Sequence, residues 1–144
     1  MNRTTLIRLA GLAAFALIIL ALAMLPGWRH PLGDKTEHIM AFAAMTILCL
    51  RSRTFLARME FLLPIMVSGA IAIEVLQQVF SASRTASMSD VSASLIGIIA
   101  GIVVSQMKGR SFAVALIGLC GFALAMNWAI NTGRYELIGM FHHA

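Results

Sequence analysis

The sequence predicts an all-α fold, a polytopic transmembrane helical bundle of about five helices that forms a single integral membrane domain over residues 1–144. Composition is the first observation, because 60% of the residues are hydrophobic and 12% are charged. Soluble domains average about 45–50% apolar and about 25% charged residues. The second observation is that apolar runs of the length needed to cross a bilayer recur along the chain. The third is that no run shows the alternation of apolar and polar residues that membrane β-barrels require.

The first helix is predicted at about Leu6–Leu25, where Pro26-Gly27 provides a helix stop. Basic residues precede this run, as they do in a signal peptide. However, its uncharged stretch covers residues 9–28, which is longer than the roughly 7–15 apolar residues of a signal peptide. The first helix is therefore expected to be retained as a transmembrane helix.

The second helix is predicted at about Asp34–Leu50. Only Ile39–Leu50 is free of charged residues and of histidine. At about 1.5 Å per residue that stretch is too short to cross a hydrocarbon core of about 30 Å. The polar residues at the start of this segment are therefore expected to belong to the membrane-spanning helix itself.

The third helix is predicted at about Phe61–Phe80, with Pro64 in its first turn, where proline is tolerated. The fourth is predicted at about Ser89–Met107. Ser89 is a suitable N-cap for this helix, and the carboxylate of Asp90 in its first turn complements the helix dipole.

The fifth helix is predicted at about Phe112–Ile130, after a very short turn. The remaining segment, Asn131–Ala144, is expected either to lie at the membrane interface or to be disordered. In the first case Tyr135 and Phe141 are its candidate anchors.

The Lys and Arg residues predict the orientation, because cytoplasmic loops carry an excess of them. With the N-terminus inside, the cytoplasmic side receives Arg3, Arg8, Arg51, Arg53, Arg58, Lys108 and Arg110. The outer side receives Arg29, Lys35, Arg84 and Arg134. We therefore expect a multi-pass protein of the cell (inner, cytoplasmic) membrane with a cytoplasmic N-terminus and an outer C-terminus.

The net charge and the positions of the cysteines indicate which binding partners the sequence predicts. The formal net charge of +5 comes from short loops, where basic residues set topology, and no basic stretch is long enough to indicate a nucleic-acid site. Cys49 and Cys120 lie in apolar segments without metal-type spacing, and we interpret them as packing residues. Membrane lipids are the predicted surroundings.

Polar residues from three consecutive helices fall at one predicted depth, near the outer ends of those helices. Such residues are costly in hydrocarbon and are candidates for function by default. The predicted ligand-binding set is Asp34, Lys35, His38, Glu74, Gln77, Arg84, Ser87, Asp90 and Ser94. They are expected to line a polar pocket on the outer face, with Arg84 above it. Below them, Gly97 and Gly101 form a small-xxx-small pattern that predicts close helix packing, within the chain rather than with a second copy.

This ordered set of motifs resembles the VanZ-like family of small membrane proteins over about residues 5–107. The resemblance is carried by Asp34-Lys35-x-x-His38, Glu74-x-x-Gln77, Arg84, Ser87, Asp90 and Gly97-x-x-x-Gly101. It implies a four-helix core with an additional C-terminal helix at about 112–130. One departure is visible, because the family pattern usually places Asn where this chain has Ser94.

The resemblance also implies a role at the cell envelope. The family is named after a protein associated with teicoplanin resistance, an antibiotic resistance, and it implies no particular reaction. A protein of this family that binds an envelope lipid, a glycan or a membrane-protein partner is one prediction. A membrane-embedded enzyme is another, in which His38 is paired with Glu74 or Asp90 as general acid and base. A small transporter or proton relay is a third.

Simpler roles stay open for the same residues. Lys35 and Arg84 fit interfacial anchors, His38 fits a structural hydrogen bond to Glu74 or Asp90, and Asp90 fits a helix-start residue. His38, Glu74 and Asp90 also suit zinc or manganese chemically. Because three loosely placed ligands are weak grounds for a metal site, the sequence predicts neither a metal nor a cofactor.

Overall fold

A computed structural model describes residues 2–24, 34–80 and 87–142, and within these ranges it contains helices and no strand. The elements are α1 (Arg3–Ala23), α2 (Asp34–Arg51), the short 3-10 helix η2 (Phe55–Ala57), α3 (Met59–Phe80), α4 (Met88–Gln106) and α5 (Gly109–His142). The all-helical prediction is confirmed for these residues. The expected limits of the first four helices lie within three residues of the observed ones.

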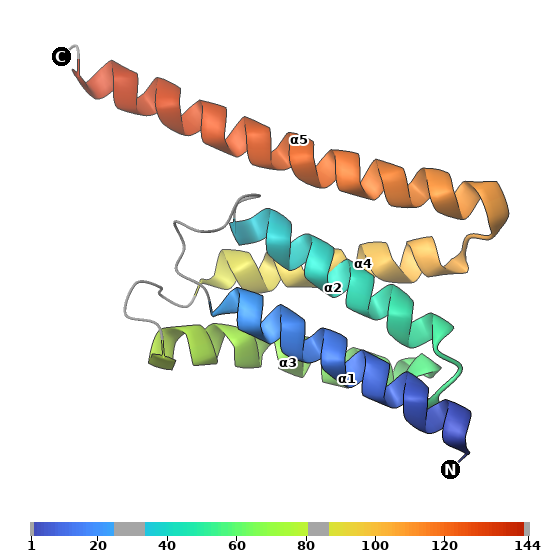
Figure 1. Ribbon diagram of the computed structural model, residues 1–144. Coiled ribbons are helices and arrows are strands. Elements are labelled where there is room, and N and C mark those ends of the chain that lie inside the picture. Colours follow the sequence, from blue (N-terminus) through green and yellow to red (C-terminus); the bar gives the residue numbers. More distant parts are fainter. Residues whose placement is uncertain (1, 25–33, 81–86, 143–144) are drawn as a thin grey trace.

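The helices alternate in direction along the chain (Figure 1). As a result, the last turns of α1 and α3 lie at the same end of the molecule as the first turns of α2 and α4. The predicted polar residues of α2, α3 and α4 belong to these turns or lie within two turns of them. The direction of the helices therefore brings the candidate residues to one end.

The fifth helix is longer than the sequence predicts. The expected end at Ile130 is wrong, because α5 continues to His142 and takes in the segment expected to be interfacial or disordered. The physical reason is that no proline interrupts residues 109–142. Gly133 and Gly139 weaken a helix by only about 1 kcal/mol each and do not end it.

Three helices in the described part of the chain are long and apolar enough to cross a membrane, namely α1, α3 and α4. Their surfaces carry large exposed apolar side chains, among them Leu17 at 65%, Ile71 at 50% and Ile99 at 63% exposure. In α5 the apolar stretch Gly109–Phe122 is shorter. These apolar helices indicate a membrane protein.

The closest pair of helices is α2 and α4, although α3 separates them in the sequence. A Cβ atom on Gly97 would overlap the backbone carbonyl of Ile39, and one on Gly101 would lie 2.7 Å from the carbonyl oxygen of Ala43. The two backbones therefore touch where both glycines lie. The small-xxx-small stripe of α4 packs against α2 of the same chain.

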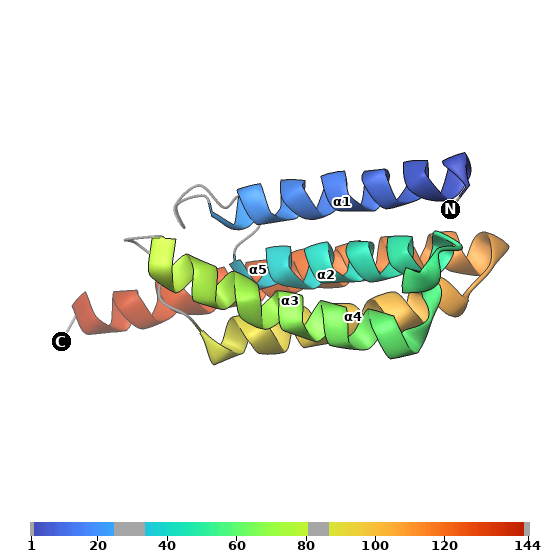
Figure 2. The same ribbon diagram turned by 90° about the horizontal axis from the view of Figure 1, so that it is seen from below.

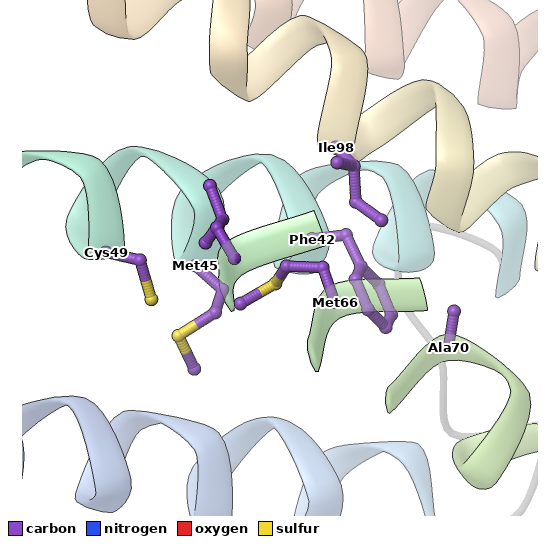
Figure 3. Close-up of a cluster of buried hydrophobic side chains, with 7 residues drawn as sticks. Phe42, Met45, Cys49, Met66, Ala70 and Ile98 are labelled. Carbon is purple, nitrogen blue, oxygen red and sulfur yellow. The ribbon is translucent and has the colours of Figure 1, made fainter. Parts of the chain in front are cut away.

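A buried apolar cluster continues this contact towards α3. It consists of Phe42, Met45, Cys49, Leu62, Met66, Ala70 and Ile98 (Figure 3). In contrast, α1 lies along one flank of the bundle and has no buried residue (Figure 2). A cleft of about 160 Å³ between α1, α2 and α3 is lined by Ala16, Ile19, Ala41, Phe42, Met45, Ile65, Met66, Gly69 and Ile73.

At the opposite end of the bundle, Arg51 joins three helices. Its guanidinium donates a 2.7 Å hydrogen bond to the carbonyl of Met107, just after α4. It also lies 3.8 Å from the ring centroid of Phe112 in α5. This last residue of α2 therefore fixes the tight turn that leads from α4 into α5.

Candidate functional site

His38 lies on α2, and its imidazole extends towards α4. Its Nδ1 lies 3.0 Å from Ser94 Oγ, and the ring is stacked on Phe42 one turn later with an interplanar angle of 5°. Ser94 Oγ donates its single proton to the carbonyl oxygen of Asp90 at 3.0 Å. Because that proton is engaged, Ser94 accepts a hydrogen bond from His38, and Nδ1 must carry a proton. In a neutral ring this arrangement places the lone pair on Nε2.

Glu74 extends from α3 towards the same point. Its Oε2 accepts a 2.9 Å hydrogen bond from the backbone N–H of Ser87, the N-cap residue of α4. Its Oε1 lies 3.6 Å from Nε2 of His38, which is longer than a hydrogen bond. Glu74 is only 3% exposed, and Oε1 has no hydrogen-bond partner. A buried acceptor in this condition is unusual in folded proteins.

Asp90 completes the group from the first turn of α4. It is 7% exposed, and its Oδ1 receives only a long contact of 3.4 Å from the hydroxyl of Ser89. One ligand atom each from His38, Glu74 and Asp90 lies within 4.8 Å of the others. We refer to these three side chains as the polar triad. Three helices contribute one member each.

Gln77 does not join the polar triad. Its side-chain amide donates a 2.8 Å hydrogen bond to the carbonyl of Ala23, the last residue of α1. The final carbonyls of a helix lack partners within the helix, so this contact caps α1. Gln77 is 1% exposed, whereas the neighbouring Gln78 is exposed.

The remaining predicted residues fall into three groups. Ser87 reaches Glu74 through its backbone, while its hydroxyl lies 2.6 Å from that of Ser89. Lys35 is half-buried at the start of α2. Arg84 and the side chain of Asp34 lie outside the part of the chain that the structure describes.

Three polar residues near this site or below it were not among the predicted site residues. One of them, Ser89, was expected as the N-cap of the fourth helix, but it lies inside α4, whose N-cap is Ser87. Thr36 is 2% exposed and Thr46 is fully buried, both on α2, and Ser89 contacts both Ser87 and Asp90. Thr46 lies against Gly101 of α4, and its hydroxyl has no hydrogen-bond partner. The spacing from Ile39 and Ala43, seven and three residues earlier, places it on the face that meets α4. That spacing is the signal that would have identified Thr46.

The polar triad offers acceptors in a buried setting. Two carboxylates and an imidazole can bind a cation, an ammonium group or hydroxyl groups, and a positioned imidazole beside a carboxylate can also move protons. Comparison of the chain with protein-family models, with curated proteins and with solved structures finds no match.

Proposed function

We propose that this chain is a polytopic membrane protein of the cell envelope whose polar triad binds the headgroup of an envelope lipid or glycan. In this proposal the N-terminus is cytoplasmic and the triad lies towards the outer face. The distribution of Lys and Arg supports this orientation, because it would place seven of them on the cytoplasmic side and four outside, in line with the usual cytoplasmic excess. The three apolar helices support insertion in a membrane.

The observation that carries the proposal is that Oε1 of Glu74, buried beside His38 and Asp90, has no hydrogen-bond partner. Leaving such an acceptor without a donor costs about 1–3 kcal/mol, and more for a charged group. A ligand that brings N–H or O–H donors removes that penalty. The favoured headgroups are therefore those with an ammonium or with sugar hydroxyls.

The motif resemblance supports the choice of residues, and it extends the proposal to a VanZ-like protein. His38, Glu74 and Asp90 are the members of the VanZ-like motifs that meet in this fold. A protein partner at the same face is compatible with the same acceptors. The resemblance does not favour one of these ligands (an envelope lipid, a glycan or a protein partner) over the others.

A second candidate function is supported by the fixed tautomer of His38. Nδ1 lies 3.0 Å from Ser94 Oγ, and Nε2 lies 3.6 Å from Oε1 of Glu74. An oriented base beside a carboxylate is the arrangement used in general acid–base catalysis. The corresponding reaction would act on a lipid-linked or cell-wall substrate.

Headgroup binding can be tested with photoactivatable lipids. The full chain is reconstituted with an ethanolamine lipid, a glycosylated lipid or a choline lipid, and crosslinking is quantified. Choline is the matched control because it is cationic but has no N–H or O–H donor. We expect the ethanolamine or glycosylated probe to label the chain at least about tenfold more than the choline probe, which corresponds to one charge-assisted hydrogen bond.

Two variants sharpen this test. Glu74→Gln should reduce labelling about tenfold, and Glu60→Gln should leave it unchanged, because Glu60 is an exposed carboxylate near the other end of α3. Equal labelling by the choline lipid, or full labelling of Glu74→Gln, would contradict the proposal. Conversion of a probe that His38→Ala abolishes would instead favour the enzyme. Labelling of right-side-out but not inverted vesicles tests the orientation.

A further inference from the structure

We propose that the polar triad is a binding site for a divalent transition-metal ion, with zinc as the best fit. The ligands are Nε2 of His38, one carboxylate oxygen of Glu74 and one of Asp90. The inference concerns the same residues as the headgroup proposal but stands without it, since it needs no lipid or glycan. It also revises the sequence-based expectation that the chain holds no metal.

The first support is the spacing of the candidate ligand atoms. His38 Nε2 and Glu74 Oε1 are 3.6 Å apart, too far for a hydrogen bond. Metal–ligand bonds of about 2.0–2.1 Å in a tetrahedral site place neighbouring ligands about 3.3–3.4 Å apart. One atom from each of the three residues lies within 4.8 Å of the others. Closure onto a metal therefore requires shifts of about an ångström or less in side chains that are already adjacent.

The second support is that one carboxylate oxygen of Glu74 makes no hydrogen bond. Oε2 is held by the backbone N–H of Ser87, and Oε1 is buried without a hydrogen-bond partner. Metal-ligating carboxylates are commonly fixed by such a hydrogen bond. This buried oxygen without a hydrogen bond is the observation that distinguishes the polar triad from an ordinary cluster of acidic residues.

The third support is the way His38 is presented. A metal-ligating histidine donates its other ring N–H to an oxygen, which fixes the tautomer and the ring orientation. Ser94 Oγ is that oxygen at 3.0 Å, and it is itself anchored to the carbonyl of Asp90. The same short segment of α4 thus provides one ligand and positions another.

Charge gives the fourth support. In the described part of the chain, neither Glu74 nor Asp90 has a Lys or Arg partner within salt-bridge distance. Two carboxylates this close repel each other in a poorly solvated setting unless a proton or a cation lies between them. One imidazole and two carboxylates match the nitrogen and oxygen preference of zinc. Three protein ligands leave a fourth position open.

The test is direct metal binding by the full chain in detergent, without added lipid. The protein is stripped with a chelator and titrated with Zn²⁺ by calorimetry, and Co²⁺ serves as a spectroscopic probe for tetrahedral coordination. We expect about one Zn²⁺ per chain, visible Co²⁺ bands and a higher melting temperature with Zn²⁺. Mg²⁺ and Ca²⁺ should bind much more weakly, since they prefer all-oxygen sites.

Variants assign the ion to the polar triad. Glu74→Gln and Asp90→Asn should each weaken Zn²⁺ binding at least about 100-fold, because even loss of an outer contact costs about 10–100-fold. Glu60→Gln and the double variant His142→Ala/His143→Ala serve as controls and should bind as the unaltered chain does. Circular dichroism checks that each variant is helical.

Three results would overturn the inference. These are no Zn²⁺ bound by the unaltered chain, binding that survives in both Glu74→Gln and Asp90→Asn, and tighter binding of Mg²⁺ or Ca²⁺ than of Zn²⁺. The Co²⁺ spectrum and the melting shift need no variant, so a variant that fails to fold leaves the test intact. A chain that labels with headgroup probes yet binds no metal separates the two proposals.

Discussion

At the scale of single residues, Ser94 is the contact that organises the site. Its hydroxyl donates to the Asp90 carbonyl and accepts from His38, and it is fully buried. The VanZ-like family that the sequence resembles usually has Asn at the corresponding point of its pattern, and a carboxamide also combines a donor with an acceptor. A hydroxyl one turn after Asp90 is therefore sufficient to orient the imidazole in this chain.

Ser94→Ala should remove the hydroxyl oxygen that lies 3.0 Å from Nδ1 of the buried His38. We expect a loss of about 1–3 kcal/mol in the free energy of unfolding, measured by denaturation in detergent. The same change should weaken Zn²⁺ binding about 10–100-fold, because the orientation of the ligand is lost.

The matched control for this change is Ser92→Ala. Ser92 makes the same type of hydrogen bond, to the carbonyl of Met88 four residues earlier, but Ser92 is exposed and forms no hydrogen bond with the described residues of α2. Equal effects of the two changes would show that Ser94 acts only within its own helix.

The members of the site were predictable to different degrees. Helix direction brings His38, Glu74 and Asp90 to one end, and that follows from counting the helices. In contrast, the hydrogen bond from Gln77 to the carbonyl of Ala23 could not be predicted by counting the helices. Three residues after Glu74, its side chain points about 60° to one side and closer to the helix end. In the folded chain α1 lies there, and the position of α1 is decided by packing that the sequence pattern does not specify.

At the scale of elements, the contact between α2 and α4 is the central packing feature. The glycines of α4 face Ile39, Ala43 and Thr46 without intervening side chains. This backbone contact places His38 and Ser94 within hydrogen-bond distance, one turn or less from Ile39 and Gly97. The spacing of the glycines in the sequence predicted a close contact, and the partner helix came from the fold.

Gly97→Ala should force α2 and α4 apart, because the new methyl group would meet backbone atoms that cannot move aside. We expect a loss of about 1–3 kcal/mol in the free energy of unfolding, as for other overpacked positions. Gly101→Ala should act in the same direction. The measurement is unfolding in detergent, followed by helical circular dichroism.

Gly69→Ala on α3 is the control for helix propensity. No atom lies within 4 Å of a Cβ placed there, so alanine should be neutral or stabilise the helix by up to about 1 kcal/mol. A loss of stability at Gly69 equal to that at Gly97 would argue against a packing origin.

Predictions of element boundaries succeeded where the sequence has clear local signals. Charged and small residues near both ends of α3 and α4 place their limits within two residues. The end of α5 was missed because apolar character fades near Ile130, while the capacity to form a helix does not. Hydropathy reports the surroundings of a helix, and a change of surroundings need not end it.

At the scale of the whole molecule, α1 is the least integrated helix. It has no buried residue and borders the cleft that it forms with α2 and α3. The hydrogen bond from Gln77 to Ala23 fixes its last turn to α3. The hydrogen bond lies at the end that carries the polar triad, and it connects the flanking helix to the bundle.

Gln77→Ala should release that turn of α1. We expect faster amide hydrogen exchange over residues 20–23 and a change of about 1 kcal/mol in global stability, the typical contribution of one hydrogen bond. Gln78→Ala is the neighbouring control, because Gln78 is exposed. Unchanged exchange in Gln77→Ala would mean that this hydrogen bond does not hold the last turn of α1 in place.

The distance in sequence between His38 and Ser94 has a consequence for biosynthesis. The two residues are 56 positions apart, and α3 is made between them. At about 5–20 residues per second, some 3–11 s pass between synthesis of the imidazole and synthesis of the hydroxyl that accepts its proton. During that interval α2 is complete, but the hydroxyl of Ser94 and the glycines of α4 that pack against α2 have not yet been made. The contact between α2 and α4 can therefore form only after this interval, whose length depends on the rate of synthesis by the ribosome.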